Sequence, residues 1–243
     1  MRTINNLPLT FTIMLVMASL VKAVGQPVTD AFLCSRELNH LNRMTQDTVH
    51  TSFQGEYVTT FNDATKDTVH YQFRTSKNRI HLVTSDSLEI IQNYMYNLVL
   101  HHDQNRAVVS RPVDVFKYIS NVNITDASFY QSFVTGMTVT DTGSYRKFSY
   151  SFKAASPYRT YDIIYDPANY RILAIQYSFN MAGANNSGSS RMPFRVTITF
   201  SNYQTGSFTD SEFSTNGYFI RKQGICNMVA PYTSYQLINS LNQ

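Results

Sequence analysis

The chain has 243 residues, of which only 15% are charged and 14% are aromatic, with 17 Tyr, 16 Phe and no Trp. Its net charge is +4, and its aromatic residues come without regularly interleaved Lys or Arg. This pattern lacks the broad basic field of a nucleic-acid-binding surface, so we expect no nucleic-acid partner. All-β domains routinely reach this length, and neither an internal repeat nor a linker divides the sequence.

Residues 1–23 have the pattern of a secretory signal peptide. Arg2 supplies the positive charge, residues 7–21 are mostly apolar, and Val21 and Ala23 are compact residues before the expected cleavage point. Cleavage after Ala23, or after Gly25, leaves residues 24–243 as a single mature β domain that is periplasmic or secreted. The alternative is a retained anchor, but the run is shorter than the roughly 20 residues that span a bilayer. Loss of Arg2 and Lys22 lowers the net charge from +4 to +2.

The mature sequence begins with a helical pattern. Thr29 or Asp30 is suited to the N-cap, since both side chains accept hydrogen bonds from the first turn. The next apolar residues recur at spacings of three and four, at Ala31, Cys34, Leu38, Leu41 and Met44. This spacing predicts an amphipathic helix of about four turns.

From Thr48 onward the hydrophobic period changes to two, which predicts strands. Residues 69–73 and 79–82 alternate apolar with polar side chains on either side of a polar turn. A hairpin that pairs Phe73 with Ile80, and Tyr71 with Leu82, brings both apolar sets to one face. The polar residues between them, including His70 and His81, are then expected to face solvent.

Alternation continues downstream and predicts an antiparallel meander. A second hairpin joins residues 98–102 to 106–110, and further strands are expected over residues 148–152, 161–165, 173–181 and 196–200. Short lid helices are predicted at residues 112–122 and 126–134, and a Gly/Ser/Asn-rich loop at 181–192. The fold class is therefore mainly β (α+β): a curved antiparallel sheet or unclosed β-barrel with an N-terminal helix and inserted lid helices.

The strands share one apolar face that is rich in aromatic rings. It can be an ordinary packed core, which is the usual fate of such a face, or the wall of a cavity, as in ligand-holding barrels. For the cavity the candidate lining residues are Val69, Tyr71, Phe73, Ile80, Leu82, Phe148, Tyr150, Phe152, Ile163, Ile175, Tyr177, Phe179, Ile198 and Phe200.

Recognisable catalytic motifs do not occur in the sequence: there is no nucleophile elbow, phosphate-binding Gly loop or His-Glu-x-x-His helix. His101 and His102 are neighbours on a predicted strand, where side chains point to opposite faces and do not share an ion. Asp162 and Asp166 are assigned to strand and turn roles. We expect no enzyme activity, no metal and no cofactor.

Two cysteines lie near opposite ends of the mature chain. Cys34 and Cys226 can form a disulfide in an oxidising compartment. Alternatively, Cys34 is a buried thiol, because it lies on the apolar face of the predicted helix. The sequence leaves both possibilities open.

The order of elements resembles that of the LolA/LolB-type periplasmic lipoprotein carriers. The segments that carry the resemblance are 53–58 (Phe-Gln-Gly-Glu-Tyr-Val), the strand series 71–111, residues 161–167 leading through 171–173 to Tyr177, and residues 196–203. The likeness is one of pattern and covers most of the mature chain. Trp is absent and the loop around residues 182–190 is long, which departs from the family.

This resemblance implies an exported protein that holds an apolar ligand, a lipid or lipoprotein acyl chain, on the concave face of a half-barrel. Transient contact with a membrane or membrane proteins is also implied. In these carriers an Arg holds the lid closed, and Arg74 and Arg79 lie near the corresponding region, on the polar face. Two other classes stay open: a secreted surface or matrix interaction protein with a filled core, and a secreted hydrolase.

The signal-peptide assignment makes the first testable prediction. We expect exported protein to begin at or near Val24 or Gln26, because the compact residues needed at the cleavage point precede these two positions. N-terminal sequencing of exported protein checks this. A mature product that still begins with Met1 would contradict it.

Overall fold

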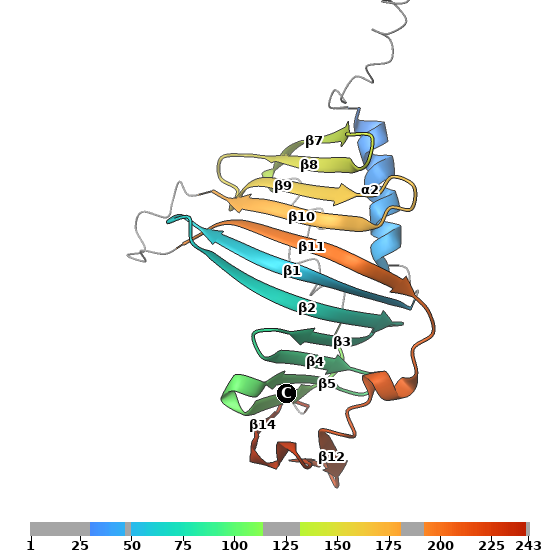
Figure 1. The fold of residues 1–243 in the computed structure, drawn as a ribbon, viewed down its shortest axis with the longest axis vertical. Helices are drawn as coiled ribbons and strands as arrows, with labels where there is room; N and C mark the ends of the chain where they lie inside the picture. The colour runs from blue at the N-terminus through green and yellow to red at the C-terminus, as the bar shows by residue number, and fades with distance from the viewer. Residues whose placement is uncertain (1–29, 47–49, 114–131, 181–191, 242–243) are drawn as a thin grey trace, which may run out of the picture.

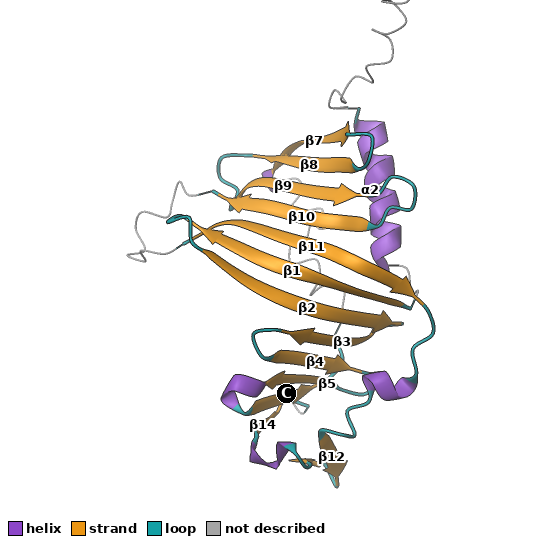
Figure 2. Ribbon diagram, in the orientation of Figure 1, coloured by secondary structure: helices purple, strands orange, loops and turns teal. Residues whose placement is uncertain are grey.

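A computed structural model describes residues 30–46, 50–113, 132–180 and 192–241. The predicted signal peptide and the Gly/Ser/Asn-rich loop at residues 181–191 lie outside the described residues, and so does most of the two predicted lid helices. In the described part, the chain is one helix followed by strands and three short 3₁₀ turns (Figures 1 and 2).

The strands differ in length from four to thirteen residues. Their bounds are β1 (Thr51–Phe61), β2 (Lys66–Ser76), β3 (Arg79–Thr84), β4 (Leu88–Gln92), β5 (Asn97–His101), β6 (Arg106–Ser110), β7 (Val134–Asp141), β8 (Arg146–Phe152), β9 (Tyr158–Tyr165), β10 (Ile172–Phe179), β11 (Pro193–Thr205), β12 (Phe219–Lys222), β13 (Ile225–Met228) and β14 (Gln236–Asn239). The 3₁₀ turns are η1 (His102–Gln104), η3 (Asp210–Phe213) and η4 (Tyr232–Ser234).

Twelve of these strands form one sheet in the order β14-β6-β5-β4-β3-β2-β1-β11-β10-β9-β8-β7. Two antiparallel meanders, β1 to β6 and β7 to β11, meet where β1 pairs with β11. The sheet is curved and its end strands, β14 and β7, do not pair with each other, so it is not closed into a barrel (Figure 1). The predicted fold class is confirmed, with one addition: β14 pairs parallel to β6.

The predicted N-terminal helix is α2 (Ala31–Gln46). Asp30 caps it as expected, because its carboxylate accepts hydrogen bonds from the backbone N–H groups of Phe32 at 2.8 Å and Leu33 at 3.0 Å. Cys34 and Leu41 are buried against the sheet, as the spacing predicts. Within the described residues, none of the helical segments combines the length and apolar character needed to cross a bilayer.

The first hairpin has a different register from the one predicted. The turn consists of Lys77 and Asn78 alone, both with positive φ, as a two-residue hairpin turn requires. Phe73 therefore pairs with Leu82, and Ile80 pairs with Thr75. The prediction centred the turn one residue too early in the chain, so each predicted cross-strand partner was wrong by two positions. Because side chains alternate with a period of two, a shift of two keeps every residue on its predicted face.

Two covering segments lie on opposite faces of the sheet. Cross-strand partners share a face, and by this rule α2 packs on the face that carries Phe148, whereas Phe219 and Leu241 pack on the other face, against Leu98. The C-terminal segment that includes β12 and β13 thus covers the opposite side at the other end of the sheet (Figure 1). The sequence-based prediction did not include this second cover.

The two cysteines are not bridged. Cys34 belongs to the core cluster beneath α2, and its thiol contacts the carbonyl oxygen of Met137 in β7 at 3.6 Å. Cys226 lies in β13 and packs against the cluster at the β4–β6 end. The two clusters occupy opposite ends and opposite faces of the sheet, so of the two possibilities that the sequence left open the structure has the separate thiols.

Gly55 is required where β1 contacts both neighbouring strands. It pairs with Tyr71 in β2 and Phe200 in β11. The Tyr71 hydroxyl donates a hydrogen bond of 2.8 Å to the Thr199 carbonyl, and this places the phenol against Gly55. A Cβ at Gly55 would lie 2.0 Å from the Thr199 carbonyl oxygen and 2.4 Å from the Tyr71 hydroxyl oxygen. Only glycine is accommodated at this position.

We therefore predict that Gly55→Ala strongly destabilises the protein. The added methyl group meets backbone rather than a movable side-chain end, so the free energy of unfolding should fall by at least the roughly 1–3 kcal/mol of core overpacking. Urea unfolding followed by circular dichroism measures this. Gly136→Ala in β7 is the matched control, because nothing lies within 4 Å of its added Cβ. Its effect should stay within about 0.5 kcal/mol, and equal losses in both variants would contradict the steric argument.

Candidate ligand-binding site

The structure brings the fourteen predicted lining residues to one side of the sheet, here called the apolar face. Pairing runs without interruption from Phe148 through Ile163, Ile175, Ile198 and Tyr57 to Val69. The opposite side, here called the reverse face, carries the alternate residues of the same strands. The β1–β11 pairing therefore aligns the apolar residues of both meanders.

Burial divides these fourteen residues into distinct groups. Nine belong to the cluster that packs beneath α2, four belong to a smaller cluster around Phe73 and Ile80, and Val69 belongs to neither. Phe148 is fully buried and Tyr150 nearly so, whereas Phe152, Phe179 and Ile198 are only partly buried. The first two are packed core, and the others retain accessible apolar surface.

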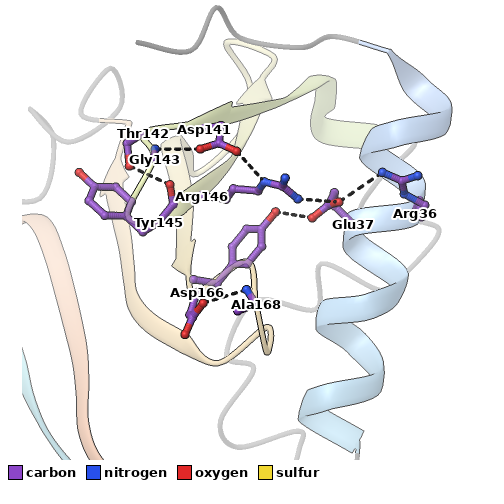
Figure 3. Close-up of polar contacts among 10 residues, drawn as sticks. Arg36, Glu37, Asp141, Thr142, Gly143, Tyr145, Arg146, Asp166 and Ala168 are labelled. Atoms are coloured by element: carbon purple, nitrogen blue, oxygen red, sulfur yellow. Dashed lines mark hydrogen bonds and ion pairs between the residues drawn. The ribbon is translucent and has the colours of Figure 1, made fainter. Parts of the chain in front are cut away.

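A buried carboxylate fixes α2 over the apolar face. Glu37 has a side chain only 4% exposed, and its oxygens accept a hydrogen bond of 2.7 Å from the Tyr165 hydroxyl and one of 3.3 Å from Arg146 (Figure 3). Arg146 also bonds Asp141 at 3.1 Å. Burial lowers the pKa of Arg146, but these carboxylates outweigh it and the net shift is upward. A buried charge with several partners is far less costly than an isolated one.

A pocket of about 400 Å³ opens on the apolar face where β8 and β10 end and β9 begins. Two of the predicted residues, Phe152 and Phe179, line it. The sequence-based prediction missed Tyr158, which stacks on Phe179 with ring centroids 5.8 Å apart. The other lining residues are Lys153, Ala154, Arg159, Asn180 and Phe194. The pocket lies within the size range of small-molecule sites and has their usual composition, apolar walls with a few polar groups.

Tyrosine hydroxyls near this pocket remain protonated. Burial, together with the neighbouring Tyr57, raises the pKa of Tyr158 and that of Tyr177. The hydroxyls of Tyr57 and Tyr177 lie 3.3 Å apart and can share a hydrogen bond. The rings of Tyr158 and Tyr177 therefore contribute neutral, mostly apolar surface to the face at neutral pH.

A larger hollow of about 630 Å³ lies on the reverse face, around β1, β2 and β11. Its lining is mainly polar and includes Gln54, Glu56, His70, Gln72 and Ser201. Tyr71 is the only one of the fourteen predicted residues that borders it. The larger of these two hollows is therefore not the predicted apolar cavity.

Arg79 holds the start of the C-terminal segment on the reverse face. Its side chain is only 7% exposed; it pairs with Asp210 and donates a hydrogen bond of 2.9 Å to the Ser76 hydroxyl. The guanidinium also lies over the Phe213 ring, 4.7 Å from its centroid, which is a favourable cation–π geometry. The sequence-based prediction placed Arg79 on the polar face, which is correct, but did not detect its burial.

Glu89 anchors the rest of that segment. It is 8% exposed and accepts hydrogen bonds from His81 at 2.8 Å, His102 at 2.9 Å and the Tyr218 hydroxyl at 2.8 Å. Tyr235 bonds the other ring nitrogen of His102 at 2.7 Å. The expectation that His81 faces solvent is wrong, because its ring bonds the buried Glu89 and only 21% of its side chain is exposed. The apolar runs of β5 and β6, which are typical of strands buried on both faces, were the available signal.

Comparison with known proteins gives structural similarity only. No family model matches the chain, and no curated protein matches it. A LolA superfamily protein from Nitrosomonas europaea matches with a TM-score of 0.36 at 10% identity, over 75% of this chain and 98% of that one. An uncharacterised conserved protein from Thermus thermophilus reaches 0.47 at 8% identity, over 85% of this chain and 99% of that one.

A putative outer membrane lipoprotein-sorting protein domain from Vibrio parahaemolyticus matches with a TM-score of 0.35 at 9% identity, over 74% of this chain and 96% of that one. The chain's resemblance to LolA-type proteins, inferred from the sequence, thus recurs among solved structures. All three TM-scores are below 0.5, so the choice of ligand rests on the residues of this site.

The Glu89 cluster predicts acid sensitivity of the C-terminal segment. Burial raises the pKa of Glu89, but the bonds from His81, Tyr218 and His102 outweigh it and hold the pKa below its ordinary 4.5. A carboxyl group with a lowered folded pKa stabilises the fold above about pH 4.5, and this contribution is lost as the pH falls through the lowered value. The ratio of backbone amide exchange in β12 and β13 to that in β9 should then be higher at pH 3.5 than at pH 7.

Hydrogen exchange with mass spectrometry measures this difference. Glu89→Gln should raise exchange in β12 and β13 already at pH 7 and remove most of its pH dependence. Glu56→Gln is the matched control, since Glu56 also faces a histidine, His70 at 3.4 Å, but is 50% exposed. Unchanged exchange in Glu89→Gln, or an equal effect of Glu56→Gln, would show that the carboxylate does not anchor the segment.

Proposed function

We propose that this protein is an exported binding protein that holds an apolar ligand, a lipid or acyl chain, against the apolar face of its sheet. The observation that carries the proposal is the pocket of about 400 Å³ lined by Phe152, Tyr158, Phe179 and Phe194. Three of these rings also pack on the main aromatic cluster. The pocket therefore continues into the partly exposed part of the apolar face.

The energetics favour an extended hydrocarbon ligand. Each CH₂ group removed from water contributes about 0.8 kcal/mol, so an acyl chain of moderate length offers several kcal/mol of binding free energy. Part of this offsets the loss of translational and rotational freedom on binding. The rings provide the complementary wall, because the phenols are neutral and the ring edges and faces accept CH contacts.

Export to a compartment bounded by a membrane suits the role of a lipid-binding protein. The signal-peptide pattern at residues 1–23 supports delivery to the periplasm or the exterior, where a water-insoluble chain has to be shielded during transfer. Transient contact with a membrane would supply or receive the ligand. The structural resemblance to LolA-type proteins agrees with this role without specifying the ligand.

A fluorescence titration with a pyrene-labelled long-chain alcohol tests the proposal. We expect saturable binding to the wild-type protein and at least fivefold weaker binding to Phe152→Ala and Phe179→Ala, because each removes one wall of the pocket. Both variants should lose less stability than the roughly 3–5 kcal/mol typical of a ring deleted from a packed core. Their rings already retain accessible surface.

Phe148→Ala is the matched control. Its ring is fully buried beneath α2 and does not line the pocket, so it should lose about 3–5 kcal/mol of stability while the protein that remains folded still binds the probe. If the wild type does not bind the alcohol, and all three variants are equally destabilised, the apolar face is a filled core. The interaction-protein alternative would then be favoured.

A further inference from the structure

Two cations stand at the mouth of the aromatic pocket. Lys153 and Arg159 line it together with the rings of Phe152, Tyr158, Phe179 and Phe194, and its lining among the described residues includes no carboxylate. Both Lys153 and Arg159 are exposed. Long basic side chains commonly lay their methylene stems along apolar surface while the charged end stays in water. The pocket thus has an apolar wall and a positively charged rim.

A β-bulge at this rim places Tyr158 and Arg159 next to each other at the pocket. Ser178 of β10 pairs with Thr160 of β9, but the next residue, Phe179, pairs with Tyr158, so Arg159 is an extra residue without a partner position in β10. Bulges bend a strand and redirect a side chain, and they are frequent beside functional sites. Regular alternation from Ile163 and Tyr161 would place Arg159 on the apolar face and Tyr158 on the reverse face, so the bulge brings Tyr158 onto the same face as Arg159.

The turn that carries Lys153 is held by defined hydrogen bonds. The Ser156 N–H donates to the Lys153 carbonyl at 3.0 Å, and the Ser156 hydroxyl accepts from the Tyr158 N–H at 3.1 Å. Ser156 itself is buried. Asn180 joins the turn to β10, because its backbone N–H donates to the Pro157 carbonyl at 2.8 Å and its side-chain amide donates to the Ala154 carbonyl at 2.6 Å. The backbone that presents both cations is therefore fixed relative to the rings.

We infer that the pocket selects an anionic amphiphile: an acyl chain on the aromatic wall with its carboxylate or phosphate head group between Lys153 and Arg159. The inference rests on the proposed function and adds the class of head group to it. Arg binds carboxylates and phosphates through two parallel hydrogen bonds, and Lys adds a point charge. A neutral head group, such as an alcohol, gains neither interaction.

Paired probes separate this inference from the proposed function. Pyrene-labelled fatty acid and the pyrene-labelled alcohol of equal chain length are titrated at pH 7.5 into the wild type and into the Lys153→Gln/Arg159→Gln double variant. We expect the wild type to bind the acid about tenfold more tightly than the alcohol, the effect of one charge-assisted hydrogen bond at a partly exposed site. The double variant should bind both probes with the affinity that the wild type has for the alcohol.

The matched control is Arg221→Gln/Lys222→Gln, which removes the same two charges from β12, at the other end of the sheet. It should keep the tenfold preference for the acid. The preference in the wild type should also shrink at high salt, because the rim is exposed to screening ions. Displacement of the probe by dodecanoate or by dodecyl phosphate, at lower concentration than by dodecanol, supports the inference and identifies the favoured anion.

Other outcomes overturn the inference. If the wild type binds the acid and the alcohol with equal affinity, the head group does not contribute to binding, while the proposed function stands. If the double variant binds neither probe, Lys153 and Arg159 maintain the structure of the turn rather than bind the head group. If the control variant also loses the preference for the acid, that preference arises from the net charge of the protein. Failure of both probes to bind the wild type removes the proposed function itself.

Discussion

The pairing of β1 with β11 is the contact on which the rest of the structure depends. It joins residues far apart in the chain, such as Tyr57 and Ile198, and it makes one sheet from two meanders. A slip of one residue would turn the apolar residues of one meander to the opposite side. Gly55 lies in this pairing, with Tyr71 and Phe200 on either side. The continuous apolar face, and hence the pocket at its end, follows from this register.

Buried charges attach the two covers to the sheet. Glu37 attaches α2 to the apolar face, while Arg79 and Glu89 hold the C-terminal segment on the reverse face. Each has several hydrogen-bonding partners, which lessens the desolvation cost of a buried charge. Such polar contacts also fix position more narrowly than apolar packing, because hydrogen bonds depend on direction. The sheet is thus covered at opposite ends on opposite faces, which leaves the partly exposed rings near β8 to β10.

The pocket combines elements that have different structural causes. Strand alternation places Phe152 and Phe179 on one face, and the bulge at Arg159 adds Tyr158 to that face. The two cations lie in the bulge and in the turn before it. Chemical selectivity therefore resides where the sheet ends. The lining of the polar hollow on the reverse face, around Gln54 and Gln72, includes Tyr71 but no Phe, Lys or Arg among the described residues.

The sequence by itself determined the local structure: the N-terminal helix with its cap at Thr29 or Asp30, the strand periods, and the side of the sheet to which the fourteen apolar residues point. These follow from periods of 3.6 and 2 that short segments carry. It did not determine the register of the first hairpin or the separation of Cys34 from Cys226. Nor did it reveal the burial of Arg79 and Glu89 beneath the C-terminal segment, or the bond between His81 and Glu89. The hairpin register depends on which two residues form the turn, Lys77 and Asn78. The positions of the two cysteines and of the buried charges depend on contacts between residues more than 100 positions apart. Only the tertiary structure decided these, because no local pattern records which distant segment covers a given face.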